Sequence, residues 1–361
     1  MTEDSVFLKA CRREETPYTP VWLMRQAGRY MKDYRLLRER TPFLDICKNK
    51  DLVTEITIGA QEKIGADAAI IFSDILLIVE PFGFDLSYLK GDGPSIRRAP
   101  STGSARGSGQ RRGARALRTA EDVERLPDID PEESLGFLME AIRQTRRALK
   151  PEVPLIGFAG APFTLASYLI EGGASKDFAA TKEWMRRRPG AWGVLMEKIA
   201  RATAKYLNAQ VRAGAQALQI FDSWVGCLSA EEYKNFALPH SAALIRSLDQ
   251  GVPVIHFGTG TDPFLELFSR AGGDVIGVDH RVRLDEARER IGTKQAIQGN
   301  LDPQLLSTGS LAEIKRGVQS ILKQAAGRSG HIFNLGHGVL PETPPKNVVA
   351  LIQMVHELSQ R

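Results

Sequence analysis

Two arginines stand four residues apart directly after an apolar run near the start of this 361-residue chain. Residues 20–24 are mostly hydrophobic, and Arg25 and Arg29 follow them, with Gly28 between. This pattern predicts a short buried strand that ends at a turn carrying two guanidinium groups. Such groups bind carboxylates or phosphates through paired, charge-assisted hydrogen bonds. On this stretch alone, an anion site and a surface loop whose arginines pair with acidic neighbours are equally supported.

Other polar side chains also follow apolar stretches. Asp74 ends the stretch 65–74, and His337 lies between two glycines after the stretch 331–335, where backbone room is available for a ligand. Tyr168 falls about two turns into an expected helix, a position more typical of a core residue. The remaining polar candidates at the ends of apolar stretches are Asp222, Ser223, His256, Asp279 and Asn300.

Metal binding and nucleophilic catalysis are weakly supported by these residues. His256 is followed by Phe257 and Gly258, and the chain's three cysteines are far apart, so neither a metal site nor a disulfide framework is predicted. Ser223 lies in Phe-Asp-Ser-Trp rather than in a G-x-S-x-G turn. We therefore interpret it as a hydrogen-bond donor or a strand-end hydroxyl.

Eight apolar stretches, nearly all separated by helical patterns, can position these residues. They begin at Val21 and continue at 65–74, 154–160, 214–223, 252–258, 274–279, 295–300 and 331–336. Strands buried on both faces that alternate with helices predict a parallel sheet. Eight of them over this length favour an α/β fold with a single (β/α)8 TIM barrel domain over residues 1–361, in which the polar strand ends share one face. A doubly wound open sheet is the alternative, but no G-x-G-x-x-G motif follows an early strand.

The positive charge of the chain is concentrated in one segment. The net charge is +5, but seven arginines and no acidic residue lie between Gly93 and Ala120, and without those arginines the net charge would be −2. We interpret residues 97–118, rich in Arg, Gly and Ser, as a flexible insertion within a long excursion over residues 75–153. The functional alternative is electrostatic attraction of an anionic substrate or partner. A polyanion-binding role for the whole molecule, such as nucleic-acid binding, is not predicted.

Composition predicts a protein of the cytoplasm that does not enter the membrane. Hydrophobic residues make up 43 % and charged residues 25 % of the chain, and no apolar run approaches the roughly 18 residues of a membrane span. The acidic start of the chain lacks the build of a signal peptide.

Six motifs, in order along the chain, resemble those of the uroporphyrinogen decarboxylase family. They are Met-Arg-Gln-Ala-Gly-Arg-Tyr at 24–30, Phe-Ser-Asp-Ile-Leu at 72–76, Gly-Ala-Pro-Phe-Thr at 160–164, Ile-Phe-Asp-Ser at 220–223, Gln-Gly-Asn-Leu-Asp-Pro at 298–303 and Asn-Leu-Gly-His-Gly at 334–338. The resemblance covers almost the whole chain except about 97–118. It implies a homodimeric (β/α)8 enzyme that decarboxylates the four acetate side chains of uroporphyrinogen III to give coproporphyrinogen III, without metal or organic cofactor.

The resemblance also implies a role for each matching residue. Asp74 would bind the pyrrole N–H groups of the substrate and stabilise the transition state. Arg25 and Arg29 would hold substrate carboxylates, with backbone contacts beside them. Those backbone contacts would come from Gln26, Ala27 and Gly28, and further contacts to the carboxylates would come from Tyr168, Ser223 and His337. Phe158 and Phe221 would wall the macrocycle.

The chain departs from the family pattern at His280, where many members are expected to carry tryptophan. Two other functions are kept as alternatives. Zinc-dependent corrinoid methyltransferases of the same superfamily share the barrel, but Gly258 leaves no thiol two residues after His256 for a zinc ion. A non-catalytic tetrapyrrole-binding or nucleic-acid-binding protein would work through the 97–118 segment.

Overall fold

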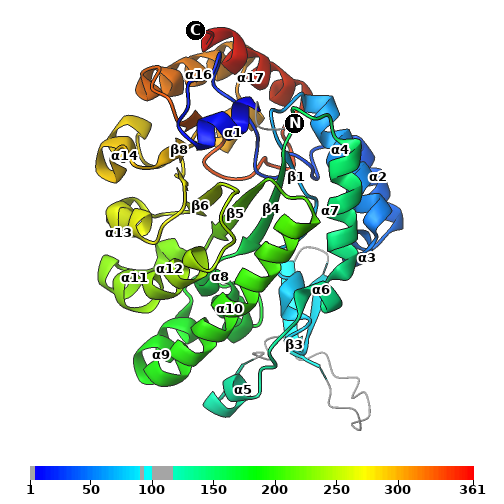
Figure 1. The fold of residues 1–361 in the computed structure, drawn as a ribbon, viewed down its shortest axis with the longest axis vertical. Coiled ribbons are helices and arrows are strands. Elements are labelled where there is room, and N and C mark those ends of the chain that lie inside the picture. Colours follow the sequence, from blue (N-terminus) through cyan, green and yellow to red (C-terminus); the bar gives the residue numbers. More distant parts are fainter. Residues whose placement is uncertain (1–4, 90–92, 100–116) are drawn as a thin grey trace.

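The computed structural model describes residues 5–89, 93–99 and 117–361 (Figure 1). Within these residues, seven parallel strands form one curled sheet, with helices around its outside. In their order in the sheet, the strands are β1 (Ala69–Ile70), β4 (Leu155–Gly160), β5 (Ala217–Asp222), β6 (Val254–Gly258), β7 (Val275–Gly277), β8 (Ala296–Gln298) and β9 (His331–Ile332). The parallel α/β fold predicted from the alternation of apolar stretches and helical patterns is confirmed.

The helices fill most of the connections between strands. They are α1 (Val6–Cys11), α2 (Lys32–Arg40), α3 (Phe43–Lys48), α4 (Lys50–Ile64), α5 (Ala120–Glu124), α6 (Pro131–Ser134), α7 (Gly136–Ala148), α8 (Pro162–Glu171), α9 (Ala179–Arg187), α10 (Pro189–Ala213), α11 (Ala230–Phe236), α12 (Leu238–Arg246), α13 (Leu265–Arg270), α14 (Leu284–Ile291), α15 (Pro303–Thr308), α16 (Leu311–Ala325) and α17 (Pro345–Leu358). Short 3₁₀ turns occupy Leu77–Val79, Val225–Cys227 and Asp262–Phe264. Among the described helices, none has both the length and the apolar composition needed to cross a membrane.

Local sequence signals set where helices begin and end. Asn49 caps α4, because its side-chain oxygen accepts hydrogen bonds from the backbone N–H groups of Asp51 and Leu52. The helix ends at Gly65, whose φ of 69° favours glycine. The capping box of Ser310 and Glu313 starts α16 in the same way.

The stretch at Val21, predicted as the first of the eight strands, does not form a regular strand in the structure. Val21 makes a single parallel bridge to Phe333, just after β9. On its other side, the Asp67 N–H donates to the Val21 carbonyl at 2.8 Å, just before β1. The Val21 N–H is taken by the Asp67 side chain at 2.7 Å and not by a neighbouring backbone carbonyl, and Pro20 has no N–H to donate. Of the eight strands expected, seven are therefore regular strands of the sheet within the described residues, and the Val21 stretch contributes a single bridge.

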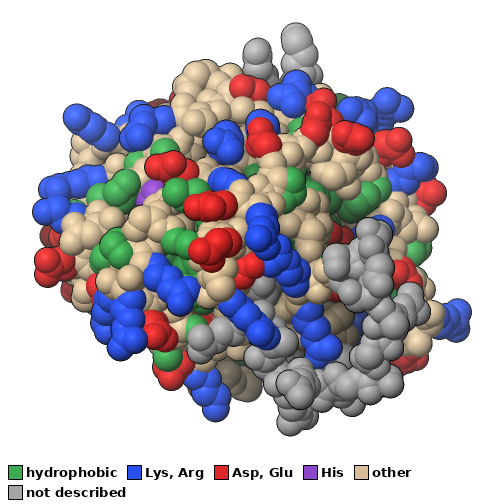
Figure 2. Space-filling model, turned by 90° about the horizontal axis from the view of Figure 1, so that it is seen from below, with side chains coloured by type: hydrophobic (Ala, Val, Ile, Leu, Met, Phe, Trp, Pro, Cys, Tyr) green, Lys and Arg blue, Asp and Glu red, His purple; other side chains and the backbone are tan. Residues whose placement is uncertain are grey.

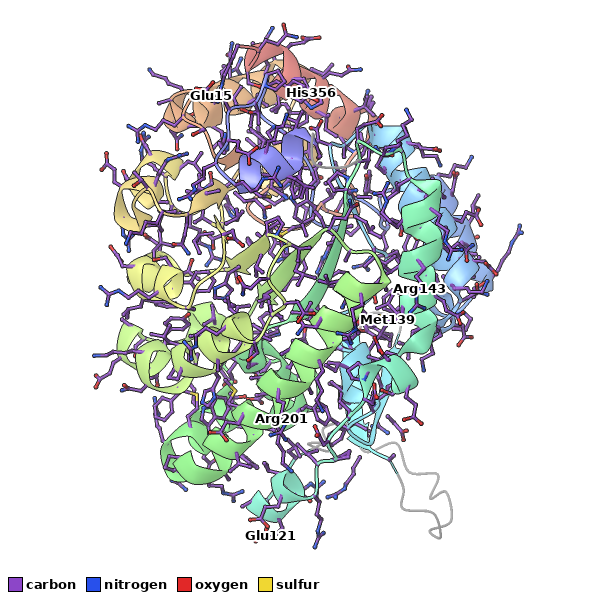
Figure 3. The ribbon with its side chains drawn as sticks, viewed as in Figure 1. Glu15, Glu121, Met139, Arg143, Arg201 and His356 are labelled. Atoms are coloured by element: carbon purple, nitrogen blue, oxygen red, sulfur yellow. The ribbon has the colours of Figure 1, made fainter. Side chains whose placement is uncertain are left out.

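Asp67 joins the start of the chain to its last helix. Besides the Val21 N–H, its carboxylate accepts hydrogen bonds from the Tyr18 hydroxyl at 3.1 Å and contacts His356 Nε2 at 2.7 Å. His356 lies on α17, where Figure 3 labels it. Because the Asp67 side chain is only 10 % exposed, removing one of its hydrogen-bond partners would leave a polar group buried without a partner and would destabilise the fold.

An antiparallel hairpin follows the 3₁₀ turn after Asp74. It consists of β2 (Phe84–Leu89) and β3 (Gly93–Arg98), which lie outside the curled sheet (Figure 1). The excursion predicted over residues 75–153 was not expected to contain strands. Arg97 and Arg98 belong to β3, so the predicted flexible insertion at 97–118 is wrong at its first two residues. The rest of that prediction falls mainly on residues 100–116, which lie outside the described residues.

Candidate active site

Asp74 lies four residues after β1, at the turn into the 3₁₀ segment. Its Oδ1 accepts a hydrogen bond from the Leu76 N–H at 2.8 Å, and its side chain is partly buried. Burial raises the pKa of Asp74, while the Leu76 N–H, the Tyr88 hydroxyl and the Arg25 charge lower it. The result is a carboxylate in an environment of low dielectric constant, held beside one arginine and one tyrosine.

The turn that carries Arg25 is tied to the last motif of the chain. Asn334 Oδ1 accepts hydrogen bonds from the N–H groups of Met24, at 3.1 Å, and Leu335, at 2.8 Å. A Cβ on Gly338 would overlap the Arg25 side chain, so glycine lets that side chain pass across the backbone. Arg25 itself has a φ of 64°, which is uncommon for a residue other than glycine and typical of functional sites.

The side chain of Gln26 has a structural role. It is 1 % exposed, its Oε1 accepts from the Leu23 N–H at 3.1 Å, and its Nε2 donates to the Ala68 carbonyl at 3.1 Å. Among the described residues, no hydrogen-bond acceptor is found for the next three backbone N–H groups, those of Ala27, Gly28 and Arg29. Successive unpaired N–H groups at a turn suit an anion.

Arg25 is the centre of the predicted site. Burial lowers the pKa of Arg25 and the charge of Arg29 lowers it further, whereas Asp74 and Tyr168 raise it. Tyr168 on α8 is 9 % exposed, and burial raises the pKa of its hydroxyl to about 12. These interactions place the two arginines, Asp74 and Tyr168 in one cluster, although they come from three distant parts of the sequence.

His337 belongs to the same cluster. Its pKa is lowered first by burial and then by the charges of Arg25 and His280, and it is raised by Asp279. A Cβ on Gly336 would overlap the His280 backbone, so this glycine allows the loop after β7 to approach the His337 loop closely. His280, the departure from the family pattern, is therefore an exposed imidazole next to His337.

Ser223 lies one residue after β5, at the same ends of the strands. Its carbonyl accepts a hydrogen bond from Thr259 Oγ1 at 2.6 Å, and no hydrogen bond among the described residues joins its hydroxyl to Arg25 or Asp74. Nearby on the sheet, Phe158 and Phe221 pack edge to face with ring centroids 5.5 Å apart. Neighbouring strands β4 and β5 thus present two aromatic rings.

Three polar residues at the ends of apolar stretches hold loops or pack in the core. His256 is fully buried within β6 and stacks on Phe268 at 3.9 Å, and burial lowers its pKa to about 3. The buried Asp279 accepts the N–H groups of Gly260 and Arg281, at 2.6 and 3.0 Å. Asn300 Nδ2 donates to the carbonyls of Asp279 and Val282. The side chains of Asp279 and Asn300 thus hold loops, His256 packs in the core, and Asp279 also acts on His337 through its charge.

Asp222 is a buried carboxyl behind the site. Its Oδ1 accepts a hydrogen bond from Thr164 Oγ1 at 2.9 Å, and Thr164 Oγ1 in turn accepts from the Trp224 N–H at 3.3 Å. Its Oδ2 has no hydrogen-bond partner among the described residues. Burial raises the pKa of Asp222 from 3.8 to about 7.

We expect Asp222→Asn to stabilise the protein above pH 7 and to flatten the pH dependence of its stability. In the folded protein the pKa of Asp222 is about 7, whereas the ordinary pKa of an aspartate, which applies to the unfolded chain, is 3.8. The protonated carboxyl therefore contributes stability that is fully present below about pH 4 and is lost as pH rises through 7. Each pKa unit is worth about 1.4 kcal/mol, which bounds the effect at roughly 4 kcal/mol. Asparagine keeps an oxygen for Thr164 and carries no charge.

The measurement is the free energy of unfolding in urea at pH 5, 6.5 and 8. The exposed Asp85→Asn serves as the matched control and is expected to leave the pH dependence of the wild type unchanged. Equal pH slopes for wild type and Asp222→Asn would contradict the prediction.

One tyrosine near the site was missed by the sequence analysis. Tyr88, on β2, has a hydroxyl that lowers the pKa of Asp74. The alternation of Phe84, Leu86 and Tyr88 is the sequence signal of a half-buried strand that could have located it.

The fold and this cluster define an α/β protein with a charged site at the ends of parallel strands, in which the partly buried Asp74 carboxylate lies beside Arg25, and Arg25 beside Arg29. Seen from below (Figure 2), basic and acidic side chains of the described residues are interspersed on the molecular surface. Within the described residues, no group of three or more His, Cys, Asp or Glu side chains could hold a metal ion.

Comparison with known proteins assigns the family. Residues 2–358 match the sequence profile described as "Uroporphyrinogen decarboxylase (URO-D)". A protein of Carboxydothermus hydrogenoformans named uroporphyrinogen decarboxylase is 49 % identical over 357 residues, covering 99 % of this chain and 97 % of its own. One of Sorangium cellulosum with the same name is 49 % identical over 353 residues, covering 98 % and 96 %. The chain belongs to the uroporphyrinogen decarboxylase family.

A solved structure supports the fold alone. A methyltransferase from Methanosarcina mazei superposes with a TM-score of 0.75 at 22 % identity, covering 98 % of this chain and 97 % of its own. At this identity the likeness concerns the arrangement of strands and helices and not the reaction.

Proposed function

We propose that this protein removes carbon dioxide from the four acetate side chains of uroporphyrinogen III, giving coproporphyrinogen III. The observation that carries the proposal is the gathering of Asp74, Arg25, Arg29, Tyr168 and His337 in one cluster, in a chain 49 % identical to proteins named for this activity. The alternative of a zinc-dependent corrinoid methyltransferase is not favoured, since the relatives over the full chain carry the decarboxylase name.

The substrate itself supplies the electron sink. Protonation of a pyrrole carbon next to the nitrogen makes the ring cationic, so that the electron pair of the breaking C–C bond flows into the ring as carbon dioxide leaves. A second proton then converts the resulting methylene group to methyl, and loss of the ring proton restores the pyrrole. Each acetate thus exchanges one carbon dioxide for one proton.

Asp74 would stabilise the cationic ring. Its carboxylate would accept the pyrrole N–H groups, and their hydrogen bonds strengthen as positive charge develops on the ring. A preorganised charge in a desolvated site contributes most of the rate enhancement in many enzymes. The Leu76 N–H already fixes one oxygen of this carboxylate at 2.8 Å, so little reorganisation is needed.

The arginine turn would bind and orient the eight carboxylates of the substrate. Arg25 and Arg29 provide bidentate donors, and the N–H groups of Ala27, Gly28 and Arg29, which have no acceptor among the described residues, add backbone donors. Tyr168, Ser223 and His337 would contact further carboxylates, and Phe158 and Phe221 would pack against the macrocycle. Orientation of this kind lowers the entropic part of the barrier.

For the fold, we propose that the Val21 stretch closes the sheet into a single-domain (β/α)8 barrel. The hydrogen bonds of residues 20–22 with Phe333 on one side and Asp67 on the other support this closure. The homodimer and the cytoplasmic location expected from the sequence stay predictions.

The test is incubation with enzymically generated uroporphyrinogen III, followed by separation of the porphyrins by their number of carboxyl groups. We expect the eight-carboxyl substrate to disappear and the four-carboxyl product to accumulate, in protein treated with a chelator as well as in untreated protein. Binding without loss of carboxyl groups would instead indicate a non-catalytic tetrapyrrole-binding protein. Activity that requires stoichiometric, tightly bound zinc would also contradict the proposal.

A further inference from the structure

The β2–β3 hairpin buries one row of side chains. Along β2, Phe84 and Leu86 are 4 % and 6 % exposed, whereas Asp85 and Ser87 between them are exposed. Because side chains alternate across a strand, Tyr88 continues the buried row. It is the last residue of this row before the hairpin turn, and it extends toward the Asp74 carboxylate.

The Tyr88 hydroxyl is buried and lacks a well-formed hydrogen bond. Its oxygen has almost no exposed surface, and no partner with good hydrogen-bond geometry is found among the described residues. The ring is held by Phe43, edge to face, with centroids 4.7 Å apart. A buried hydroxyl without a hydrogen-bond partner lowers the stability of the folded protein by about 1–3 kcal/mol, so its presence calls for an explanation. The Asp74 carboxylate interacts with it, and that carboxylate has one oxygen, Oδ2, beyond the one bonded to the Leu76 N–H.

We propose that Tyr88 is a positioning residue whose hydroxyl donates a hydrogen bond to the Asp74 carboxylate and thereby sets its orientation toward the substrate. This inference rests on the proposed function of Asp74 as the group that meets the pyrrole N–H groups. With Leu76 and Tyr88 as donors from two different elements, the carboxylate would be held at both oxygens before the substrate binds.

The hairpin is attached to the helix that carries Tyr168. Ser95 bridges Gly173, and the Ile96 N–H donates to the Gly172 carbonyl at 2.9 Å, at the end of α8. A Cβ on Gly173 would lie 2.7 Å from the Pro94 carbonyl oxygen, so the close approach of the hairpin requires glycine there. The hairpin that carries Tyr88 is therefore attached to the end of the helix that carries Tyr168.

The charges around Asp74 define the sign of the expected pH effect. The groups that interact with it are Arg25 on the arginine turn, Tyr88 on β2, Tyr168 on α8, Cys47 on α3 and Tyr206 on α10. Of these tyrosines, Tyr88 is the one whose hydroxyl lowers the pKa of Asp74. Burial and the Asp74 charge raise the pKa of Tyr88 itself, so it remains a protonated donor. Loss of its hydroxyl would raise the pKa of Asp74.

The experiment compares Tyr88→Phe with wild type. Phenylalanine keeps the ring against Phe43 and removes only the hydroxyl. We expect kcat to fall by about 10- to 100-fold, the range for a hydrogen bond to a charged group, and the acid limb of the kcat profile to move to higher pH. The unfolding midpoint is expected to stay within a few degrees of wild type. Tyr233→Phe is the matched control, because Tyr233 is a buried tyrosine of α11 that stacks on Phe264 and lies near Asp222 rather than Asp74.

A readout independent of turnover separates this inference from the proposed function. The Asp74 carboxyl is followed by carbon NMR during an acid titration of labelled protein, with Asp74→Asn used to assign its signal. A higher midpoint in Tyr88→Phe than in wild type and Tyr233→Phe supports the hydrogen bond, even if uroporphyrinogen proves not to be the substrate. An unchanged midpoint, or an unchanged acid limb with full kcat, would overturn the inference.

Discussion

Replacing Asp74 with asparagine is expected to lower kcat by about 10²–10³, the usual loss when one preorganised electrostatic group is removed from an active site. Asparagine has nearly the same shape, and its side-chain oxygen can still accept the Leu76 N–H that Asp74 accepts at 2.8 Å. What is lost is the negative charge that would face the cationic pyrrole. The loss should fall on kcat more than on KM, because this interaction strengthens only in the transition state.

The same substitution is expected to keep or increase stability. Burial raises the pKa of Asp74, which means that holding its negative charge away from water lowers the stability of the folded protein. Steady-state kinetics and urea unfolding on one preparation test both expectations. Asp85→Asn, at an exposed position of β2, controls for a general effect of charge removal. Near-wild-type turnover of Asp74→Asn would refute the role given to this carboxylate.

Truncation of Arg25 is the second change with a large expected effect. We expect Arg25→Ala to lower kcat/KM by about 10²-fold, since a hydrogen bond to a charged group is worth roughly 1.5–3 kcal/mol and Arg25 can make two. The fall in kcat/KM should come mainly from a higher KM, because Arg25 binds substrate carboxylates equally in the ground state and in the transition state. Arg25→Lys should recover only part of the loss, as lysine restores the charge without the planar fork.

A pH titration gives Arg25→Ala a second readout. The charge of Arg25 lowers the pKa of His337, so its removal is expected to raise that pKa, which NMR of the imidazole measures directly. Arg143→Ala on α7, labelled in Figure 3, is the control at an exposed arginine. An unchanged KM together with an unchanged His337 titration would show that Arg25 lies outside the site.

Much of the fold could be predicted because burial on both faces of a parallel strand requires a continuous apolar stretch. Seven of the eight stretches contain the strands of the sheet, and all six residues of β4 are buried. The remaining stretch, at Val21, was predicted to be a strand from the same signal. It pairs with its neighbours through only a few hydrogen bonds, one of them to the Asp67 side chain. The apolar run predicts that Val21 is buried, but it does not predict which acceptor the backbone N–H of Val21 will bind.

The sequence by itself determined the parallel α/β fold, the family through its motifs, and the residues of the polar cluster. Each of these depends on local patterns of residue type and spacing, which can be recognised without knowledge of the packing. Tertiary structure alone decided which strand-end side chains point into the site. Asp74 and His337 lie in the loops after β1 and β9 and reach it, whereas His256 lies within β6 and stacks on Phe268. Successive side chains of a strand point to opposite faces of the sheet, and which face His256 takes depends on how the strand packs. Tertiary structure also placed Tyr88 beside Asp74, since that contact depends on how the hairpin packs against the end of α8.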